Sequence, residues 1–230
     1  MSEVAVVTGG SGAIGGAIAS ALRESGATVV SLDIAPAAAE WIACDVRDDA
    51  SVARAVASVV STHGRIDIAV HAAGIARDAV VWKLAPDDWD LIHEVNLRGA
   101  FFLLRHVIPV MRGGGSGRVI LIGSINGSRG KFGSSAYSAS KAGLIGLAKS
   151  VSRETGRFGI RVNVVEPGWV RTPMTDALPD ALRQRALDET LLGELAEPND
   201  IAAAVAYLAG PGGRRITGQV LRVDAGQSVA

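Results

Sequence analysis

A tyrosine and a lysine lie four positions apart in the run SSAYSASKAG (134–143), whose other members are all Ser, Ala or Gly. Residues four apart share one face of a helix, so Tyr137 and Lys141 can enter the same site while the small neighbours allow a ligand to approach. A neighbouring ammonium favours the phenolate and lowers the pKa of a phenol that ordinarily titrates near pH ~10. The spacing therefore predicts a proton-transfer site in which Tyr137 is the general acid or base.

Ser124 precedes Tyr137 and directly follows the apolar run GRVILIG (117–123), which is typical of a buried strand. Ligands of open α/β folds bind at the carboxyl ends of the strands, so we expect the Ser124 hydroxyl to hydrogen-bond a substrate oxygen. Two alternatives remain at this point. Ser124 can be a simple cap or turn residue, and Ser138 with Lys141 has the spacing of serine acylases, although no KTG or SDN follows.

A glycine-rich turn, TGGSGAIG (8–15), separates the apolar run VAVV (4–7) from an amphipathic stretch, and the next apolar run ends at Asp33. Glycines here allow the backbone to approach a pyrophosphate at the positive end of the following helix. A carboxylate about 20 residues later is placed to accept hydrogen bonds from a ribose 2′-hydroxyl and repels a 2′-phosphate. This order predicts a dinucleotide site that takes NAD. The competing interpretations are that the glycines serve only helix packing and that Asp33 only caps a turn.

Ser11 offers a different interpretation, because GGSGA at a strand-to-helix turn resembles the GxSxG nucleophile elbow of hydrolases. Ala13 stands where the final glycine is needed, and a hydrolase also needs an acid and then a histidine at later strand ends. All four histidines lie in the first half of the chain, which disfavours a hydrolase: His63, His71, His93 and His106.

The elements that must position these residues follow an alternating pattern. Amphipathic stretches, such as the one that opens at the capping candidate Asp49 and ends at Gly64, separate apolar runs. This βαβα order predicts a doubly wound Rossmann-type α/β domain over 1–230, with about seven parallel strands, helices on both faces and a substrate lid at about 172–198. The apolar runs that we identify as strands are 4–7, 27–32, 66–72, 117–123, 160–165 and 219–223.

Composition narrows the class of partner. The chain has 230 residues, 48% of them hydrophobic, with 23 Lys and Arg against 23 Asp and Glu, so nothing in its net charge favours nucleic acid or an anionic membrane. The uncharged stretch Val4–Leu22 is interrupted by five glycines and follows Glu3, which disfavours a signal peptide or membrane span. The single cysteine, Cys44, excludes an internal disulfide and a Cys-rich metal site, so we expect no metal and a reducing, cytoplasmic setting.

Several motifs in order make the whole chain resemble the short-chain dehydrogenase/reductase family. They are TGGSGAIG, Asp33, CDV with Asp45, AAG (72–74), VNLRG with Asn96, Ser124, YSASK (137–141), PGWVRT (167–172) and ITGQVLRVDAG (216–226).

The resemblance implies roles for the catalytic residues. Tyr137 would transfer the substrate proton, Lys141 would lower its pKa and bind the nicotinamide ribose, Ser124 would orient the carbonyl or alcohol, and Asn96 would hold a water-linked proton path. It also implies a set of NAD-binding residues, with Asp45 at the adenine and Thr172 at the carboxamide. That set is Gly9, Ser11, Gly12, Ala13, Ile14, Gly15, Asp33, Asp45, Val46, Ala73, Gly74, Tyr137, Lys141, Pro167, Gly168, Val170 and Thr172.

Three positions depart from the family pattern: Ala13 replaces a glycine of the turn, the family's NNAG appears as HAAG (71–74), and Glu166 replaces a small or neutral residue before Pro167. These departures leave open a rival interpretation, a dinucleotide-binding partner subunit with little catalysis. The intact set of Asn, Ser, Tyr and Lys disfavours it.

Within the family, GIARDAVVWKL (74–84), DDWD (87–90) and NLRGAFF (96–102) most resemble 3-oxoacyl-thioester reductases and 3-hydroxyacyl dehydrogenases; relatives that act on cyclic or aromatic alcohols remain an alternative. Relatives form tetramers through paired long helices, so we expect a homotetramer built on the Tyr137 helix and a helix over 86–111. Around the pocket, Arg129 and Lys131 would either attract a CoA or carrier phosphate or form a solvated pair. We expect Trp169, Met174 and 178–192 to shape that pocket.

Overall fold

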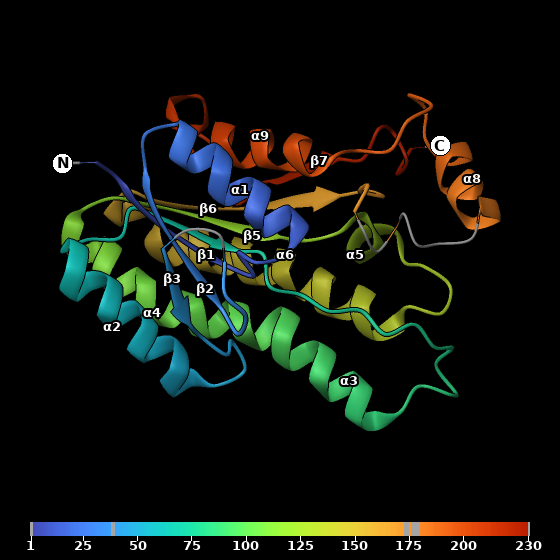
Figure 1. The fold of residues 1–230 in the computed structure, drawn as a ribbon, viewed down its shortest axis with the longest axis horizontal. Helices are drawn as coiled ribbons and strands as arrows, with labels where there is room; N and C mark the ends of the chain where they lie inside the picture. The colour runs from blue at the N-terminus through green and yellow to red at the C-terminus, as the bar shows by residue number, and fades with distance from the viewer. Residues whose placement is uncertain (1, 38–39, 173–174, 176–179, 230) are drawn as a thin grey trace.

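The computed structural model describes residues 2–37, 40–172, 175 and 180–229. One seven-stranded sheet runs through this part of the chain, in the order β3-β2-β1-β4-β5-β6-β7, and every pair of neighbouring strands is parallel (Figure 1). The strands are β1 (Val4–Thr8), β2 (Thr28–Asp33), β3 (Trp41–Ala43), β4 (Ile68–His71), β5 (Gly117–Ile122), β6 (Ile160–Pro167) and β7 (Val220–Val223).

Helices connect most of the successive strands and lie on both faces of the sheet, as the apolar runs and amphipathic stretches predicted. The principal ones are α1 (Ala13–Glu24), α2 (Asp49–His63), α3 (Pro86–His93), α4 (Gly99–Gly114), α5 (Ile125–Arg129), α6 (Ser135–Thr155), α8 (Asp180–Asp188) and α9 (Pro198–Ala209). A π-helical turn, Glu94–Arg98, joins α3 to α4, so the long helix expected over 86–111 contains a break in its register.

Two apolar cores hold these layers together. In Figure 1, α1 and α9 lie on one face of the sheet, while α2, α4 and α6 lie on the other. The alternation of β1 shows why a parallel strand is apolar throughout: Val4 and Val6 face the α2–α4–α6 side, whereas Ala5 and Val7 face α1 and α9. Because both faces are covered here, every residue of β1 is buried on one side or the other.

The sequence located six of the seven strands and missed β3. This edge strand has only three residues, Trp41–Ala43, and its side chains are exposed or half-buried, so it lacks the apolar run that marked the others. The start of α2 also needs a correction, because the capping residue is Asp48, whose carboxylate accepts from the N–H of Ala50; Asp49 is the first helical residue. Gly64 ends α2, as predicted, and adopts the left-handed conformation.

Among the described residues, no helix is long and apolar enough to cross a lipid bilayer. Nor do the described His, Cys, Asp and Glu residues form a group of three or more that could hold a metal ion.

Candidate active site

The strand order reverses between β1 and β4, because the chain runs outward from β1 to β2 and β3 and then returns to β4 on the other side. Ligands of open α/β sheets bind in the crevice beyond the carboxyl ends of the strands at such a reversal. The glycine-rich turn follows β1 and the Ala73–Gly74 turn follows β4, so the topology brings together two of the predicted dinucleotide-binding segments.

The two turns are in close backbone contact. Gly9 has φ +70°, and a Cβ on it would lie 2.6 Å from the amide nitrogen of Ala73. A Cβ on Gly15 would overlap the carbonyl oxygen of Gly9, and one on Gly10 would lie 2.5 Å from the hydroxyl of Ser31. Gly12 is the N-cap of α1 and offers no side chain to its first N–H groups. The turn therefore leaves the backbone open to a pyrophosphate at the helix terminus.

The remaining residues of the turn lie along its outer side. Ala13 is exposed at the first position of α1, Ile14 packs partly against the α1–α9 core, and Ser11 is exposed. The methyl group of Ala13 therefore projects away from the contacts that Gly9 and Gly15 make.

Asp33, at the end of β2, faces the turn. Its Oδ2 accepts from the N–H and the hydroxyl of Ser11, at 3.0 and 2.6 Å, and its Oδ1 accepts from the N–H of Ala35. Burial acts to raise the pKa of Asp33, yet the hydrogen bonds from Ser11 and the nearby backbone hold that pKa below its ordinary value. A fixed negative charge thus stands beside the glycine-rich turn.

Asp45 and Val46 lie after β3, further along the same edge. Asp45 forms a two-point ion pair with Arg47, with 2.6 Å between Oδ2 and the guanidinium, and this bond lowers the pKa of Asp45. Val46 is buried, and its Cβ would lie 3.0 Å from a Cβ placed on Gly99. Within the described part of the chain, Asp45 forms no hydrogen bond or ion pair with the glycine-rich turn or with Tyr137.

His71 ends β4 and is fully buried. Its Nδ1 lies 3.0 Å from the hydroxyl of Thr8 on β1, and the same hydroxyl accepts from the N–H of Ala73. Burial and the charge of Lys141 lower the pKa of His71 to about 3, so its ring is neutral at physiological pH. The histidine thus takes part in joining β1 to the Ala73–Gly74 turn.

Asn96 lies in the π-helical turn and is completely buried. Its Oδ1 accepts from the N–H of Ile75 at 2.8 Å, and its Nδ2 donates to the carbonyl of Ile75 and to the hydroxyl of Ser140 on α6. A Cβ on Gly74 would lie 3.4 Å from Asn96 Oδ1 and 3.2 Å from Lys141 Nζ. Gly74 therefore marks the place where the amide and the ammonium come together.

Tyr137 and Lys141 project from α6 toward the same place, with the ammonium 5.6 Å from the centre of the phenol ring. Lys141 is 3% exposed and donates to the carbonyl of Ile122, at the end of β5. Burial lowers the pKa of Lys141 to about 8. The two side chains thus share one helical face, as their spacing predicted.

The expected lowering of the tyrosine pKa is not seen. Burial raises the pKa of Tyr137, a hydrogen bond with Ser124 acts in the opposite direction, and the charge of Asp78 adds to the increase. The prediction was wrong in direction because it counted the attraction of Lys141 and omitted the cost of burying a phenolate.

Ser124 is both a helix cap and a neighbour of Tyr137, so the two interpretations of this residue are compatible. It follows β5, is 6% exposed, and its Oγ accepts from the N–H of Asn126 as the N-cap of α5. Its hydroxyl also lies close enough to the Tyr137 phenol to act on the pKa of that group, so two hydroxyl groups are neighbours here. Two adjacent hydroxyls can donate to one carbonyl oxygen.

Residues 167–172 form the far wall of the crevice. Gly168 passes so close to the C-terminal segment that a Cβ would lie 2.7 Å from Gln227 Oε1, and the N–H of Trp169 donates to that same oxygen. Pro167 ends β6, Val170 is buried and bridges to Ala196, and the N–H of Thr172 donates to Thr175 Oγ1. An open cavity of about 480 Å³ lies between α8 and Trp169. Met174, expected in this wall, falls outside the described residues.

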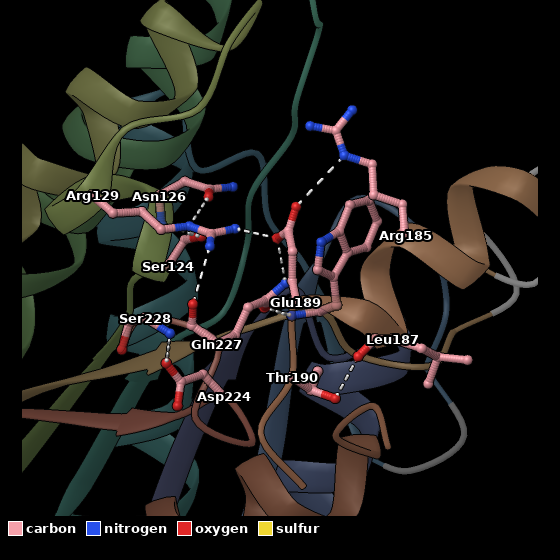
Figure 2. A network of polar contacts seen from close by, with 11 residues as sticks. Ser124, Asn126, Arg129, Arg185, Leu187, Glu189, Thr190, Asp224, Gln227 and Ser228 are labelled. Carbon is pink, nitrogen blue, oxygen red and sulfur yellow. Dashed lines mark hydrogen bonds and ion pairs between the residues drawn. The ribbon is translucent and has the colours of Figure 1, made fainter. Parts of the chain in front are cut away.

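Sequence reasoning missed a network of charged and amide side chains beside this wall (Figure 2). The guanidinium of Arg129 donates to Asn126, to the carbonyl of Gln227 and to Glu189, and the amide of Gln227 also donates to Glu189. Lys131 pairs with Asp78 at 3.0 Å. Arg129 and Lys131 are thus each engaged by a carboxylate. Their partners lie 60 and 53 positions away, a separation that no local pattern reveals.

Comparison with known proteins places these features in context. A family model described as enoyl-(acyl carrier protein) reductase matches residues 9–228. The chain is 35% identical to the 3-oxoacyl-[acyl-carrier-protein] reductase FabG of Thermotoga maritima, over 97% of each chain. It is 39% identical to the acetoacetyl-CoA reductase of a Synechocystis species, over 96% of this chain and 95% of the relative. The crystal structure of gox2181 superposes with a TM-score of 0.95 at 31% identity, over 100% of this chain and 96% of the other.

Proposed function

The chain belongs to the short-chain dehydrogenase/reductase family, and from this premise we propose that it is an NAD(H)-dependent oxidoreductase interconverting 3-hydroxyacyl and 3-oxoacyl thioesters. The observation that carries the proposal is the meeting of Ser124, Tyr137, Lys141 and Asn96 at one sheet edge, beside the glycine-rich turn. Hydroxyl, ammonium and amide groups in this arrangement suit a reaction in which a carbonyl oxygen gains a proton, or an alcohol oxygen loses one.

The residues present fit a nicotinamide dinucleotide. The Gly9 and Gly15 positions form a cradle that a Cβ would fill, and Asp33 stands at its side as a charged acceptor. Once bound, the nicotinamide supplies or accepts the hydride. We propose that the residues implied by the family resemblance bind it: the 9–15 turn, Asp33, Asp45, Val46, Ala73, Gly74, Tyr137, Lys141, Pro167, Gly168, Val170 and Thr172.

In the reductive direction, Tyr137 donates its phenolic proton to the substrate oxygen as the carbonyl carbon is reduced, and the product is the alcohol. Ser124 hydrogen-bonds the same oxygen and holds it in place. Lys141 stabilises the tyrosinate that remains, because the positive charge lies 5.6 Å from the phenol ring. Asn96, held on both sides by Ile75 and Ser140, keeps the path for re-protonation fixed. Oxidation reverses each step.

Asp33 supports NAD over NADP. Its carboxylate is held charged beside the turn by Ser11, and a 2′-phosphate placed there would be repelled. Measurement of kcat/KM with NADH and NADPH tests this choice directly. Equal values for the two cofactors would remove Asp33 as the discriminating residue.

The acyl-thioester substrate is supported by the names of the relatives and by the 74–102 motifs. The turnover of acetoacetyl-CoA should therefore be compared with that of a cyclic ketone and of a 2-enoyl thioester. The enoyl compound is included because the matching family model is described as an enoyl reductase. We expect turnover of the 3-oxo compound. Preference for the cyclic ketone or for the enoyl compound would reassign the substrate.

We also propose a homotetramer in a cytoplasmic setting. The assembly is supported by an exposed apolar area on α3 and α4, where Trp89 and Phe101 are 40% and 45% exposed. Tyr207, on α9, lies on the opposite face of the sheet. Light scattering of the purified protein measures the assembly state.

Tyr137→Phe tests the proton donor. The variant should still bind NADH but lose roughly 10²- to 10⁴-fold in kcat, because the hydroxyl that supplies the acidic proton is removed. Tyr207→Phe, which alters an exposed tyrosine, is the matched control and should match the wild type. Unaltered turnover in Tyr137→Phe would refute the assignment, and tight NADH binding without any turnover in the wild type would favour the partner-subunit alternative.

A further inference from the structure

Glu166 is a completely buried carboxylate on β6, one residue before the Pro167–Gly168 wall of the crevice. Removing a charged group from water costs several kcal/mol unless hydrogen bonds and an opposite charge compensate. Small or neutral residues avoid that cost, so the presence of a glutamate here calls for a physical reason.

The carboxylate has two partners on different elements. The hydroxyl of Ser128, on α5, lies 2.9 Å from both Oε1 and Oε2 and donates to them, and the guanidinium Nε of Arg222, on β7, lies 3.3 Å from Oε2. Glu166 and Arg222 are register partners in the sheet, whereas Ser128 belongs to a different layer. The carboxylate therefore ties α5 to the edge of the sheet.

The glutamate side chain reaches α5 past Gly123, the residue immediately before Ser124. A Cβ on Gly123 would lie 3.2 Å from Glu166 Cγ and 2.8 Å from a methyl group of Val164. The absence of a side chain at Gly123 therefore leaves the room through which Glu166 extends.

The helix α5 has only five residues and begins directly after its N-cap, Ser124. So short a helix has little stability of its own, and its placement must come from tertiary contacts. Three consecutive residues supply them. A Cβ on Gly127 would lie 2.8 Å from the N atom of Ala142 on α6, Ser128 binds Glu166, and Arg129 binds Glu189 (Figure 2 shows the Arg129 contacts).

We propose that Glu166 is a positioning residue that holds the Ser124 hydroxyl beside Tyr137 by anchoring α5 through Ser128. The proposal rests on the proposed function of Ser124 and Tyr137 and adds the residue that sets their relative placement. A hydrogen bond from a hydroxyl to a charged carboxylate is roughly twice as strong as one between neutral groups, so it restricts α5 more closely than apolar packing would.

The kinetic test compares Glu166→Ala, Glu166→Gln and Ser128→Ala. Both alanine variants should lower kcat by roughly 10- to 100-fold, because a displacement of about 1 Å at a reacting group has effects of this size. NADH affinity should stay unchanged. Glu166→Gln should recover most of the activity, because its Oε1 can still accept from Ser128. Wild-type kcat in Ser128→Ala would overturn the proposal.

Epistasis with Ser124 separates positioning from general destabilisation. In a Ser124→Ala background, Glu166→Ala should lower the remaining kcat by less than about twofold, since the group that it positions has gone. An equal loss in both backgrounds would mean that Glu166 does not act through Ser124. Glu154→Gln, which changes an exposed glutamate at the end of α6, is the matched control and should retain wild-type kinetics.

Arg222→Gln tests the other partner of the carboxylate. Because Arg222 contacts Glu166 from β7 and not from α5, its loss should leave kcat within about threefold of the wild type. A decrease as large as that of Ser128→Ala would assign Glu166 to the joining of β6 and β7 and would overturn the proposal.

Hydrogen exchange provides a readout that does not depend on turnover. The amides of 125–129 should exchange faster in Glu166→Ala and Ser128→Ala than in the wild type, while those of α9 should keep their rates. Unchanged exchange in α5 would overturn the anchoring. If the wild type turned over none of the offered substrates while α5 exchange still responded, the proposed function would fail and the anchoring would stand. Ser128→Ala, a small change at an exposed residue, replaces Glu166→Ala if that variant does not fold.

Discussion

The two sides of the crevice are held together by different kinds of contact. On the dinucleotide side, the turn after β1 meets the turn after β4 through backbone atoms, with Gly9 against Ala73 and Gly15 against Gly9. On the substrate side, side chains with charged or amide groups join α5, α8 and the C-terminal segment, with Arg129 and Glu189 as the central pair. The contact between the two turns depends on the absence of side chains, whereas the network around Arg129 and Glu189 depends on long ones. Substitutions should therefore affect the two sides in different ways.

The largest effect is expected from Gly15→Ala on the dinucleotide side. Its Cβ would overlap the carbonyl oxygen of Gly9, and backbone cannot move aside as a flexible side chain can. We expect a loss of roughly 3 kcal/mol in the free energy of unfolding, as for an overpacked site, together with loss of NADH binding. Chemical denaturation and fluorescence titration measure the two quantities.

Gly16→Ala is the control for this prediction. A Cβ there would lie 3.5 Å from the carbonyl of Gly10, an ordinary contact, and alanine is the better helix former by about 1 kcal/mol. The variant should be as stable as the wild type or more so. Equal damage from both substitutions would show that the close backbone approach is not the reason for Gly15.

A second, smaller effect concerns the buried His71 beneath the same side. Its pKa is lowered from 6.5 to about 3, so between these values the unfolded chain binds the proton that the folded chain excludes. The contribution of the neutral His71 to the free energy of unfolding is therefore fully present above pH 6.5. It declines as the pH falls toward 3, and roughly 2 kcal/mol of it is lost by pH 5. His71→Asn should remove this part of the acid sensitivity, as measured by urea unfolding at pH 5 and pH 7.

His63→Asn, at the end of α2, is the matched substitution and should leave the acid-induced loss in place. An unchanged difference between pH 5 and pH 7 in His71→Asn would show that other groups carry the acid sensitivity. The neutral imidazole of His71 would then make no measurable contribution to the pH dependence of stability.

The smallest effect is expected from Glu189→Gln on the substrate side. Arg129 and Glu189 are 29% and 35% exposed, so water screens the pair and its loss should cost about 1 kcal/mol or less in stability. We expect a several-fold rise in the KM of the acyl substrate with kcat retained, because the segment after α8 is held less firmly. Glu194→Gln, exposed in the same segment, is the control. A fall in kcat without a change in KM would contradict this role.

The same contrast explains what the sequence could predict. Glycine spacing, apolar runs and the Tyr137–Lys141 interval are local patterns, and they located six strands, the two turns and the side chains at the crevice. Glu166 contacts Ser128, 38 positions away, and Arg129 contacts Glu189, 60 positions away. No local sequence pattern predicts such pairs. The tyrosine pKa was predicted in the wrong direction because burial is a property of the folded chain.

The π-helical turn at Glu94–Arg98 makes this stretch of the chain sensitive to its residue count. A π turn holds one residue more than an α-helical turn, and each α-helical residue rotates the chain by about 100°. Deleting a single residue here would let a uniform α-helix form and would swing Asn96 away from Ile75 and Ser140. Length changes that surface loops absorb without harm would, at this point, turn the buried amide out of the interior.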